Sequence, residues 1–175
     1  FLRDSLKFHT YLNNNIKLKT KVKIFPHLEP ERQLMEKIWI NRPGVKLLNE
    51  KTIKIKEHYT RSRIIIIEEI STSFYELLKL EIPFIVMTNE FEVYTKNFTK
   101  DLLTLSKVNI FFRDPVKAAK FVNSNYHQVN GWWTKVLKSR VYKDFKEKYI
   151  PEKLNYDEFK KNLYKLKKTK TNYFQ

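Results

Sequence analysis

The chain has 175 residues, 42% hydrophobic and 15% aromatic, which is enough length and apolar character for one folded core. Lys and Arg number 35 against 19 Asp and Glu, and the net charge of +16 favours anionic partners such as phosphates, nucleic acid or an anionic membrane face without choosing among them. The absence of cysteine excludes disulfides and thiolate metal sites, and two isolated glycines exclude a P-loop and a G-x-G-x-x-G fingerprint.

The first third of the chain alternates between helical and extended patterns. Apolar spacing predicts a helix over 1–15, and the alternation of lysine with apolar residues predicts a strand within 16–25. The pattern then predicts a helix over 30–39, a short strand at 45–48 and a short helix within 52–62. This order of elements is typical of an α/β protein.

Four consecutive isoleucines at 64–67 are apolar on both faces, which predicts a central strand of a parallel sheet. The elements expected after it are a helix over 73–82, a strand over 82–87, a long amphipathic helix over 90–107, a strand at 109–112, a helix capped by Asp114 and Pro115, a helix from 131 to about 149 and a last helix over 156–168. We therefore predict an α/β fold, a three-layer Rossmann-like domain with a mainly parallel sheet over residues 1–150, followed by a basic helical tail over 151–175.

A hydroxyl cluster follows the isoleucine strand, where ligands of parallel α/β sheets usually lie. Ser71, Thr72 and Ser73 could supplement the N–H groups of a helix N-terminus around a pyrophosphate. Glu76, one turn further, could accept hydrogen bonds from a ribose diol. The same spacing also fits a capping box, in which Ser73 and Glu76 only satisfy their own helix end.

Other polar and aromatic residues carry weaker signals. His27 follows a predicted strand end near Lys23, where it could contact a phosphate or a sugar, although a purely structural role explains it equally well. Trp132 and Trp133 could stack on a sugar or pack the helix. The histidines share no metal-like spacing, so we expect neither a metal nor a cofactor.

Five segments in order resemble a family of surface-polysaccharide transferases associated with O-antigen and lipopolysaccharide gene clusters. They are KVKIFPH (21–27), SRIIIIEEISTSFYELLKLEIPFIV (62–86), NIFF (109–112), DPVKAAKFV (114–122) and GWW (131–133). Within the second segment, Ser73, Glu76 and Pro83 are similar to the donor-binding unit of GT-B glycosyltransferases, and teichoic-acid polymerases resemble the same block.

The resemblance implies the C-terminal half of a GT-B fold that transfers a sugar from a nucleotide-sugar to a surface-glycan or lipid-linked acceptor without a metal. It implies diphosphate binding by Ser71, Thr72 and Ser73, ribose binding by Glu76, and a place for Lys23 and His27 on the sugar side. It also implies a missing N-terminal half, so we expect the chain alone to be inactive. Lys23 replaces an arginine of the family pattern, and Glu68 and Glu69 replace small or hydroxyl-bearing residues.

A non-catalytic basic module is the alternative from another class, binding nucleic acid or an anionic membrane. Nucleic acid is the less favoured partner because no recognised nucleic-acid motif is present. The cysteine-free composition fits a reducing compartment, so we expect a cytoplasmic protein whose basic tail, Lys160 to Lys170, can contact the inner face of the membrane.

Overall fold

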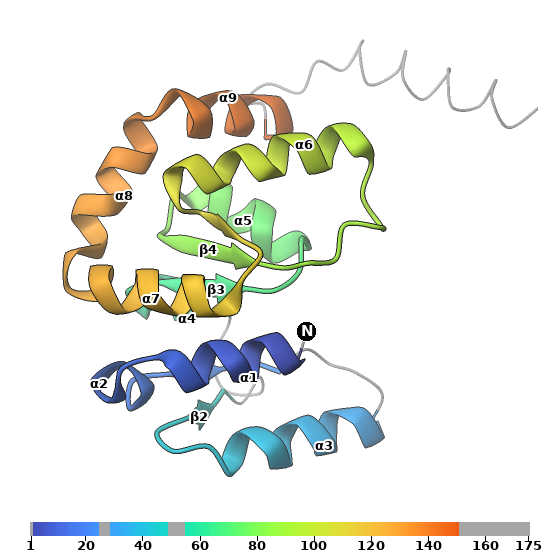
Figure 1. Cartoon of the computed structure of the whole chain (residues 1–175), viewed down its shortest axis with the longest axis vertical. Coiled ribbons are helices and arrows are strands. Elements are labelled where there is room, and N and C mark those ends of the chain that lie inside the picture. The colour runs from blue at the N-terminus through green and yellow to red at the C-terminus, as the bar shows by residue number, and fades with distance from the viewer. Residues whose placement is uncertain (1, 25–28, 49–54, 151–175) are drawn as a thin grey trace, which may run out of the picture.

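A computed structural model describes residues 2–24, 29–48 and 55–150, and Figure 1 shows the arrangement of its elements. His27 and the predicted tail, including the expected helix over 156–168, lie outside the described residues. The elements are α1 (Leu2–Tyr11), α2 (Asn14–Lys17), β1 (Lys21–Val22), α3 (Glu29–Ile40), β2 (Lys46–Leu47), α4 (Ile55–Arg61), β3 (Ile65–Ile67), α5 (Thr72–Leu80), β4 (Phe84–Met87), α6 (Lys96–Thr104), η1 (Leu105–Val108), β5 (Phe111–Phe112), α7 (Pro115–Asn125), η2 (Tyr126–Gln128), α8 (Val129–Lys138) and α9 (Arg140–Tyr149).

The strands form two parallel sheets. Strand β1 pairs with β2, and β3, β4 and β5 form a second sheet in that order. Ile65 lies opposite Phe84, and Val86 lies opposite Phe111. The predicted parallel pairing of the isoleucine strand with the strand near 84–87, through an intervening helix, is confirmed. The fold is the predicted Rossmann-like α/β class.

The central strand is β4, and not the isoleucine strand as the sequence suggested. Within the described residues β3 has one strand neighbour and lies at the edge of its sheet. The apolar run arises instead because helices cover both faces: Ile65 and Ile67 pack against one core cluster, and Ile64 and Ile66 against the other. Burial on both faces therefore identified a covered strand without identifying its place in the sheet.

Strand β4 divides the hydrophobic core into two clusters, because successive side chains of a strand point to opposite faces. Phe84 and Val86 join the cluster on the side of α5, whereas Ile85 and Met87 join the cluster on the side of α1 and α7. The exposed fraction of each of these four residues is 2% or less. Helices α1 and α7 cover one face, and α5, α6, α8 and α9 contribute the buried residues of the other, which gives the predicted three layers.

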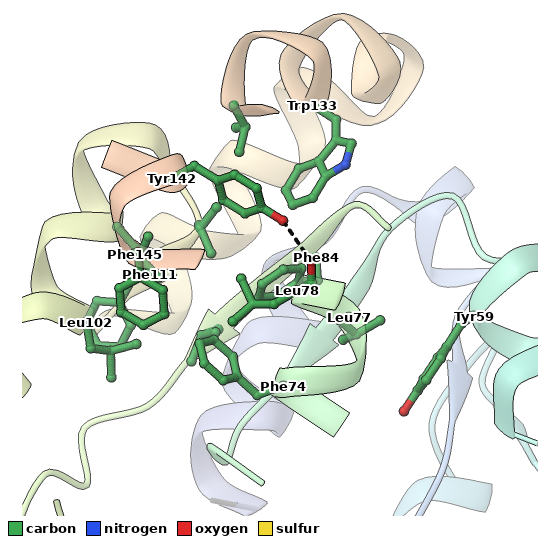
Figure 2. Close-up of a cluster of buried hydrophobic side chains, with 14 residues drawn as sticks. Tyr59, Phe74, Leu77, Leu78, Phe84, Leu102, Phe111, Trp133, Tyr142 and Phe145 are labelled. Carbon is green, nitrogen blue, oxygen red and sulfur yellow. Dashed lines mark hydrogen bonds between the residues drawn. The ribbon is translucent and has the colours of Figure 1, made fainter. Parts of the chain in front are cut away.

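Helices α8 and α9 hold the C-terminal end of α5, where helix carbonyls lack partners within the helix. Trp133 donates its indole N–H to the carbonyl of Glu81 at 2.5 Å, and the Tyr142 hydroxyl donates to the carbonyl of Leu78 at 3.2 Å. The Lys146 ammonium contacts the Glu81 carboxylate at 2.5 Å. Figure 2 shows Trp133 and Tyr142 reaching from α8 and α9 into the aromatic cluster over α5. Trp133 therefore packs against the core, which is one of the two roles that the sequence allowed, the other being stacking on a sugar.

The N-terminal helix is shorter than predicted. Helix α1 ends at Tyr11. A second helix, α2, occupies 14–17, across the boundary between the predicted helix over 1–15 and the predicted strand over 16–25. A contact across the domain accounts for the break: the Asn123 side chain on α7 donates to the carbonyl of Tyr11 at 2.9 Å and accepts from the N–H of Asn13 at 2.8 Å. Within 16–24, the described part of the predicted 16–25 strand, Lys21 and Val22 form the paired strand β1.

Two later helices also differ from their predicted lengths. Helix α6 begins at Lys96 and not near residue 90, because the Thr95 hydroxyl caps it by accepting from the N–H of Phe98 at 3.3 Å. The helix predicted over 131–149 is broken at Ser139, whose hydroxyl accepts from the N–H of Tyr142 at 3.2 Å and starts α9. Among the helices of the described part, none has the length and apolar content needed to cross a bilayer.

Replacing Tyr142 by phenylalanine tests the hold on α5. Tyr142→Phe leaves the buried Leu78 carbonyl without this donor, and we expect the free energy of unfolding to fall by about 1–2 kcal/mol in urea titrations. Tyr11→Phe, at a residue that is 50% exposed, is the matched control and should change it little. Equal effects of the two substitutions would contradict a specific role for the Tyr142 hydroxyl.

The same side chain predicts an alkaline pH dependence. Burial, and then the nearby Glu81 carboxylate, raise the pKa of Tyr142 above its ordinary value. The folded state therefore holds the Tyr142 proton more tightly than the unfolded state, and this contribution to stability is present below about pH 10 and is lost as the pH rises further. Thermal midpoints measured between about pH 8 and pH 11 should fall less steeply for Tyr142→Phe than for the wild type.

Candidate functional site

The carboxyl ends of β3, β4 and β5 meet at one edge of the sheet because the three strands are parallel. The loop after β3 leads to α5, the loop after β4 contains Thr88, Asn89 and Glu90, and the segment after β5 leads to α7. The Asn89 side chain donates to the carbonyl of Arg113 at 2.6 Å, and the N–H of Glu90 donates to the Thr88 hydroxyl at 3.2 Å. These bonds join and order the loops at this edge.

The hydroxyl cluster lies at the N-terminus of α5, as predicted. Ser71 is the N-cap residue, with extended backbone angles of φ −129° and ψ −169°, and its hydroxyl forms no capping bond to the helix. Thr72 and Ser73 occupy the first helical turn, whose N–H groups point out of the helix end. The helix N-terminus therefore offers backbone donors with the Ser71 side chain unused by the cap.

The capping-box alternative for Ser73 and Glu76 is wrong. A capping box joins the N-cap residue to the third helical residue. The N-cap is Ser71 and the third helical residue is Phe74, whose N–H donates to the backbone carbonyl of Ser71 at 3.0 Å. Ser73 and Glu76 lie further along the helix and do not close this end of it.

Ser73 and Glu76 instead lie near Tyr59, a residue of α4 that the sequence reasoning missed. Tyr59 is 4% exposed, and its buried hydroxyl has no hydrogen-bond partner among the residues that the structure describes. Burial raises the pKa of Tyr59, the neighbouring Ser73 hydroxyl lowers it, and the Glu76 carboxylate raises it. The Tyr59 ring belongs to the large core cluster drawn in Figure 2. The three side chains thus form a polar group along one side of α5, with donor capacity left at Tyr59.

A small pocket of about 80 Å³ at the same edge is lined by Asp4, Glu68, Met87, Thr88, Asn89 and Glu90. Burial is the main cause of a raised pKa at Glu68; the Ser5 hydroxyl opposes the shift and Asp4 adds to it. The structure thus places Glu68 in the pocket wall beside Asp4 of α1. Among the described residues, no group of three or more His, Asp or Glu is arranged to hold a metal ion.

Lys23 and the hydroxyl cluster follow strands of two different sheets. Lys23 is exposed and directly follows β1, in the two-stranded sheet. Helix α1 lies between that sheet and the three-stranded sheet that carries Ser71 (Figure 1). His27 falls outside the described residues, so its predicted role stays a prediction.

Tyr94 also differs from its prediction, which placed it inside the helix expected over 90–107. It lies before α6, and its hydroxyl accepts from the N–H of Ile70 at 3.3 Å, directly before the hydroxyl cluster. Phe98 packs beside its ring, with centroids 5.5 Å apart. No signal in the sequence pairs Tyr94 with Ile70, because the contact depends on how the loop after β4 folds back.

These features define an α/β domain with a polar edge at the carboxyl ends of parallel strands, which is where such folds usually bind ligands. A model of the family described as LIC12162 family transferase matches residues 1–162. The chain therefore belongs to this family of transferases, and the expectation of a transferase is confirmed at that level. Searches of curated proteins and of solved structures found no match.

Glu68 gives a testable acid dependence of stability. Its raised pKa means that its ionised form opposes folding at neutral pH, whereas below about pH 4.5 both states are protonated and the penalty is absent. We expect Glu68→Gln to raise the thermal midpoint at pH 7 and to lose this advantage as the pH approaches 4. Glu92→Gln, at an exposed position, is the control. A gain that does not depend on pH would contradict the assignment.

Proposed function

We propose that this chain is the donor-binding domain of a glycosyltransferase, with the diphosphate of a nucleotide-sugar at the N-terminus of α5. The observation that carries the proposal is the Ser71 hydroxyl, which sits at the N-cap of a helix on the carboxyl edge and is not used for capping. A helix N-terminus combines outward N–H groups with a partial positive charge, which suits a diphosphate. Thr72 and Ser73 add hydroxyl groups in the first turn.

Glu76 is proposed to bind the ribose. Glu76 is half-buried and lies near the Tyr59 hydroxyl. A carboxylate can accept hydrogen bonds from both hydroxyls of a diol. The Tyr59 hydroxyl can donate to the same carboxylate or to the ligand, and either bond would satisfy a buried group that has no partner in the structure.

The acidic pocket suits the sugar better than the phosphates. Asp4, Glu68 and Glu90 would repel a diphosphate, but their oxygens can accept hydrogen bonds from sugar hydroxyls. A volume of about 80 Å³ holds only part of a nucleotide-sugar, so the remainder would lie along the open edge. Lys23 and His27 remain proposed on the sugar side only through the family resemblance.

The remaining parts of the proposal also rest on that resemblance. The acceptor would be a surface glycan of the O-antigen or lipopolysaccharide type, or its lipid-linked precursor, and the work would be done in the cytoplasm at the inner face of the membrane. Catalysis in this half would consist of positioning the donor and stabilising its leaving diphosphate. No metal or other cofactor is proposed for these steps, and a second half would supply the acceptor site.

Glu76→Gln tests the ribose assignment. The substitution keeps the shape of the side chain but removes charge-assisted hydrogen bonds, so affinity for a nucleotide-sugar should fall about tenfold, that is by about 1–2 kcal/mol. Calorimetric titration of the chain with uridine, guanosine and cytidine diphosphate sugars measures this. Glu147→Gln, an exposed change of the same charge on α9, is the control. Unchanged affinity for Glu76→Gln would remove Glu76 from the site.

Tyr59→Phe separates a ligand role from a structural role. Because the Tyr59 hydroxyl is buried without a partner, its removal should leave the thermal midpoint unchanged or slightly higher. If the hydroxyl joins the ribose network, affinity for the nucleotide-sugar should nevertheless fall several-fold. A clear loss of stability with no change of affinity would assign the hydroxyl to the fold alone.

A basic binding module is the second candidate, and the net charge of +16 is the observation that favours it. Backbone-phosphate binding weakens steeply with salt and ignores the identity of the nucleotide. Titrations at about 50 and 200 mM salt therefore discriminate the two. Affinity that depends on the nucleotide and changes little with salt supports the donor site, whereas a steep fall shared by all nucleotides supports the basic module.

A further inference from the structure

A second and larger pocket lies at the opposite edge of the three-stranded sheet. Its volume is about 420 Å³, which is within the range of small-ligand sites. Residues 60–63, which end α4 and lead into β3, form one wall. The other wall is formed by His127 of η2 and by Val129 and Asn130 at the start of α8. Residues 60–63 lie before β3 and Ser71 lies after it, so the pocket is separate from the proposed donor site.

Arg63 is held at this pocket by Tyr126. Its guanidinium lies 5.1 Å from the centroid of the Tyr126 ring and donates to the Tyr126 carbonyl at 3.2 Å. The Lys19 ammonium lies 5.7 Å from the centroid of the same ring. The Tyr126 ring therefore makes cation–π contacts with two cationic side chains, Lys19 and Arg63. An arginine has five N–H donors, so the single bond to Tyr126 leaves others for a ligand.

Arg61 adds a second guanidinium to the pocket wall. The Arg61 guanidinium lies 3.9 Å from the Glu57 carboxylate. The two side chains are 66% and 52% exposed, and an ion pair this exposed to water is weak. Arg63 forms no ion pair with a carboxylate of the described residues. The local charge is therefore positive and poorly neutralised by the part of the protein that the structure describes.

The uncharged side chains of the pocket wall indicate which kind of ligand the pocket can bind. The hydroxyls of Thr60 and Ser62 donate to the carbonyls of Glu57 and His58, at 3.1 and 2.6 Å, and so are occupied as donors. Hydrogen bonds to a ligand would come mainly from the two guanidinium groups and the Asn130 amide. Two planar guanidinium groups, each able to donate paired hydrogen bonds, match the oxygens of phosphate groups.

We propose that this pocket binds a phosphate-bearing ligand through Arg61 and Arg63, independently of the donor site. The ligand is either a soluble phosphate compound or the phosphate of an anionic lipid headgroup. Both sources present the same chemistry to the two arginines. The site would give the chain two anion-binding positions, one at each edge of the same sheet.

Titration of the full chain with inorganic pyrophosphate, followed by calorimetry, tests the site. The double substitution Arg61→Gln and Arg63→Gln should weaken binding by tenfold or more, because it removes two charge-assisted contacts. Arg140→Gln with Lys143→Gln, two exposed changes on α9, removes the same charge and should leave binding within about twofold. Thermal midpoints of both variants show whether each remains folded.

Arg63→Lys provides a variant that keeps the charge and the fold but loses the planar fork, and it should bind several-fold more weakly than the wild type. The proposal is overturned if the wild type does not bind pyrophosphate, or if the α9 control loses binding equally. It is also overturned if Ser71→Ala abolishes binding while the arginine variants do not, because pyrophosphate would then occupy the donor site.

Co-sedimentation with phosphatidylglycerol vesicles separates the two sources of phosphate. Vesicle binding that the wild type shows and the Arg61 and Arg63 variant loses assigns the pocket to a lipid headgroup. Pyrophosphate binding that depends on the two arginines, with vesicle binding absent or unchanged in the variant, assigns it to a soluble phosphate compound.

Discussion

The burial of β4 on both faces is the constraint on which the rest of the domain depends. Phe84 and Val86 need a helical layer on one side, and Ile85 and Met87 need another on the opposite side. Full burial of a large apolar side chain contributes about 1.5–3 kcal/mol, so an uncovered face would cost several such contributions. With both faces covered, polar groups can converge only at the two edges of the sheet, and both candidate sites lie there.

The same constraint explains why a helix end can serve as a binding surface. Helix α5 is anchored in the core by Phe74, Leu77 and Leu78, which are fully buried. Hydrogen bonds from Trp133 and Tyr142 hold its C-terminal end. Its N-terminal end can then face solvent without fraying, since the rest of the helix is anchored. Groups of the core thus position the helix that begins directly after Ser71.

The large net positive charge is distributed unevenly over the two edges. The carboxyl edge gathers Asp4, Glu68 and Glu90, while the amino edge gathers arginines around Tyr126. A uniform basic surface would attract any polyanion, whereas here the two edges differ in the sign of their local charge. The departure of Glu68 from the family pattern therefore coincides with a pocket that accepts hydrogen bonds.

Local patterns in the sequence determined the fold class, the parallel pairing of 64–67 with 84–87, and the helix N-terminus at the hydroxyl cluster. These follow from apolar periodicity and from short-range signals such as Asp114 and Pro115, which act within a few residues. Only the tertiary structure decided that β4 is central, that Asn123 ends α1, and that Tyr59 faces Ser73 and Glu76. Those contacts join residues distant in the chain, and their partners are selected by the packing of layers, which no local periodicity encodes.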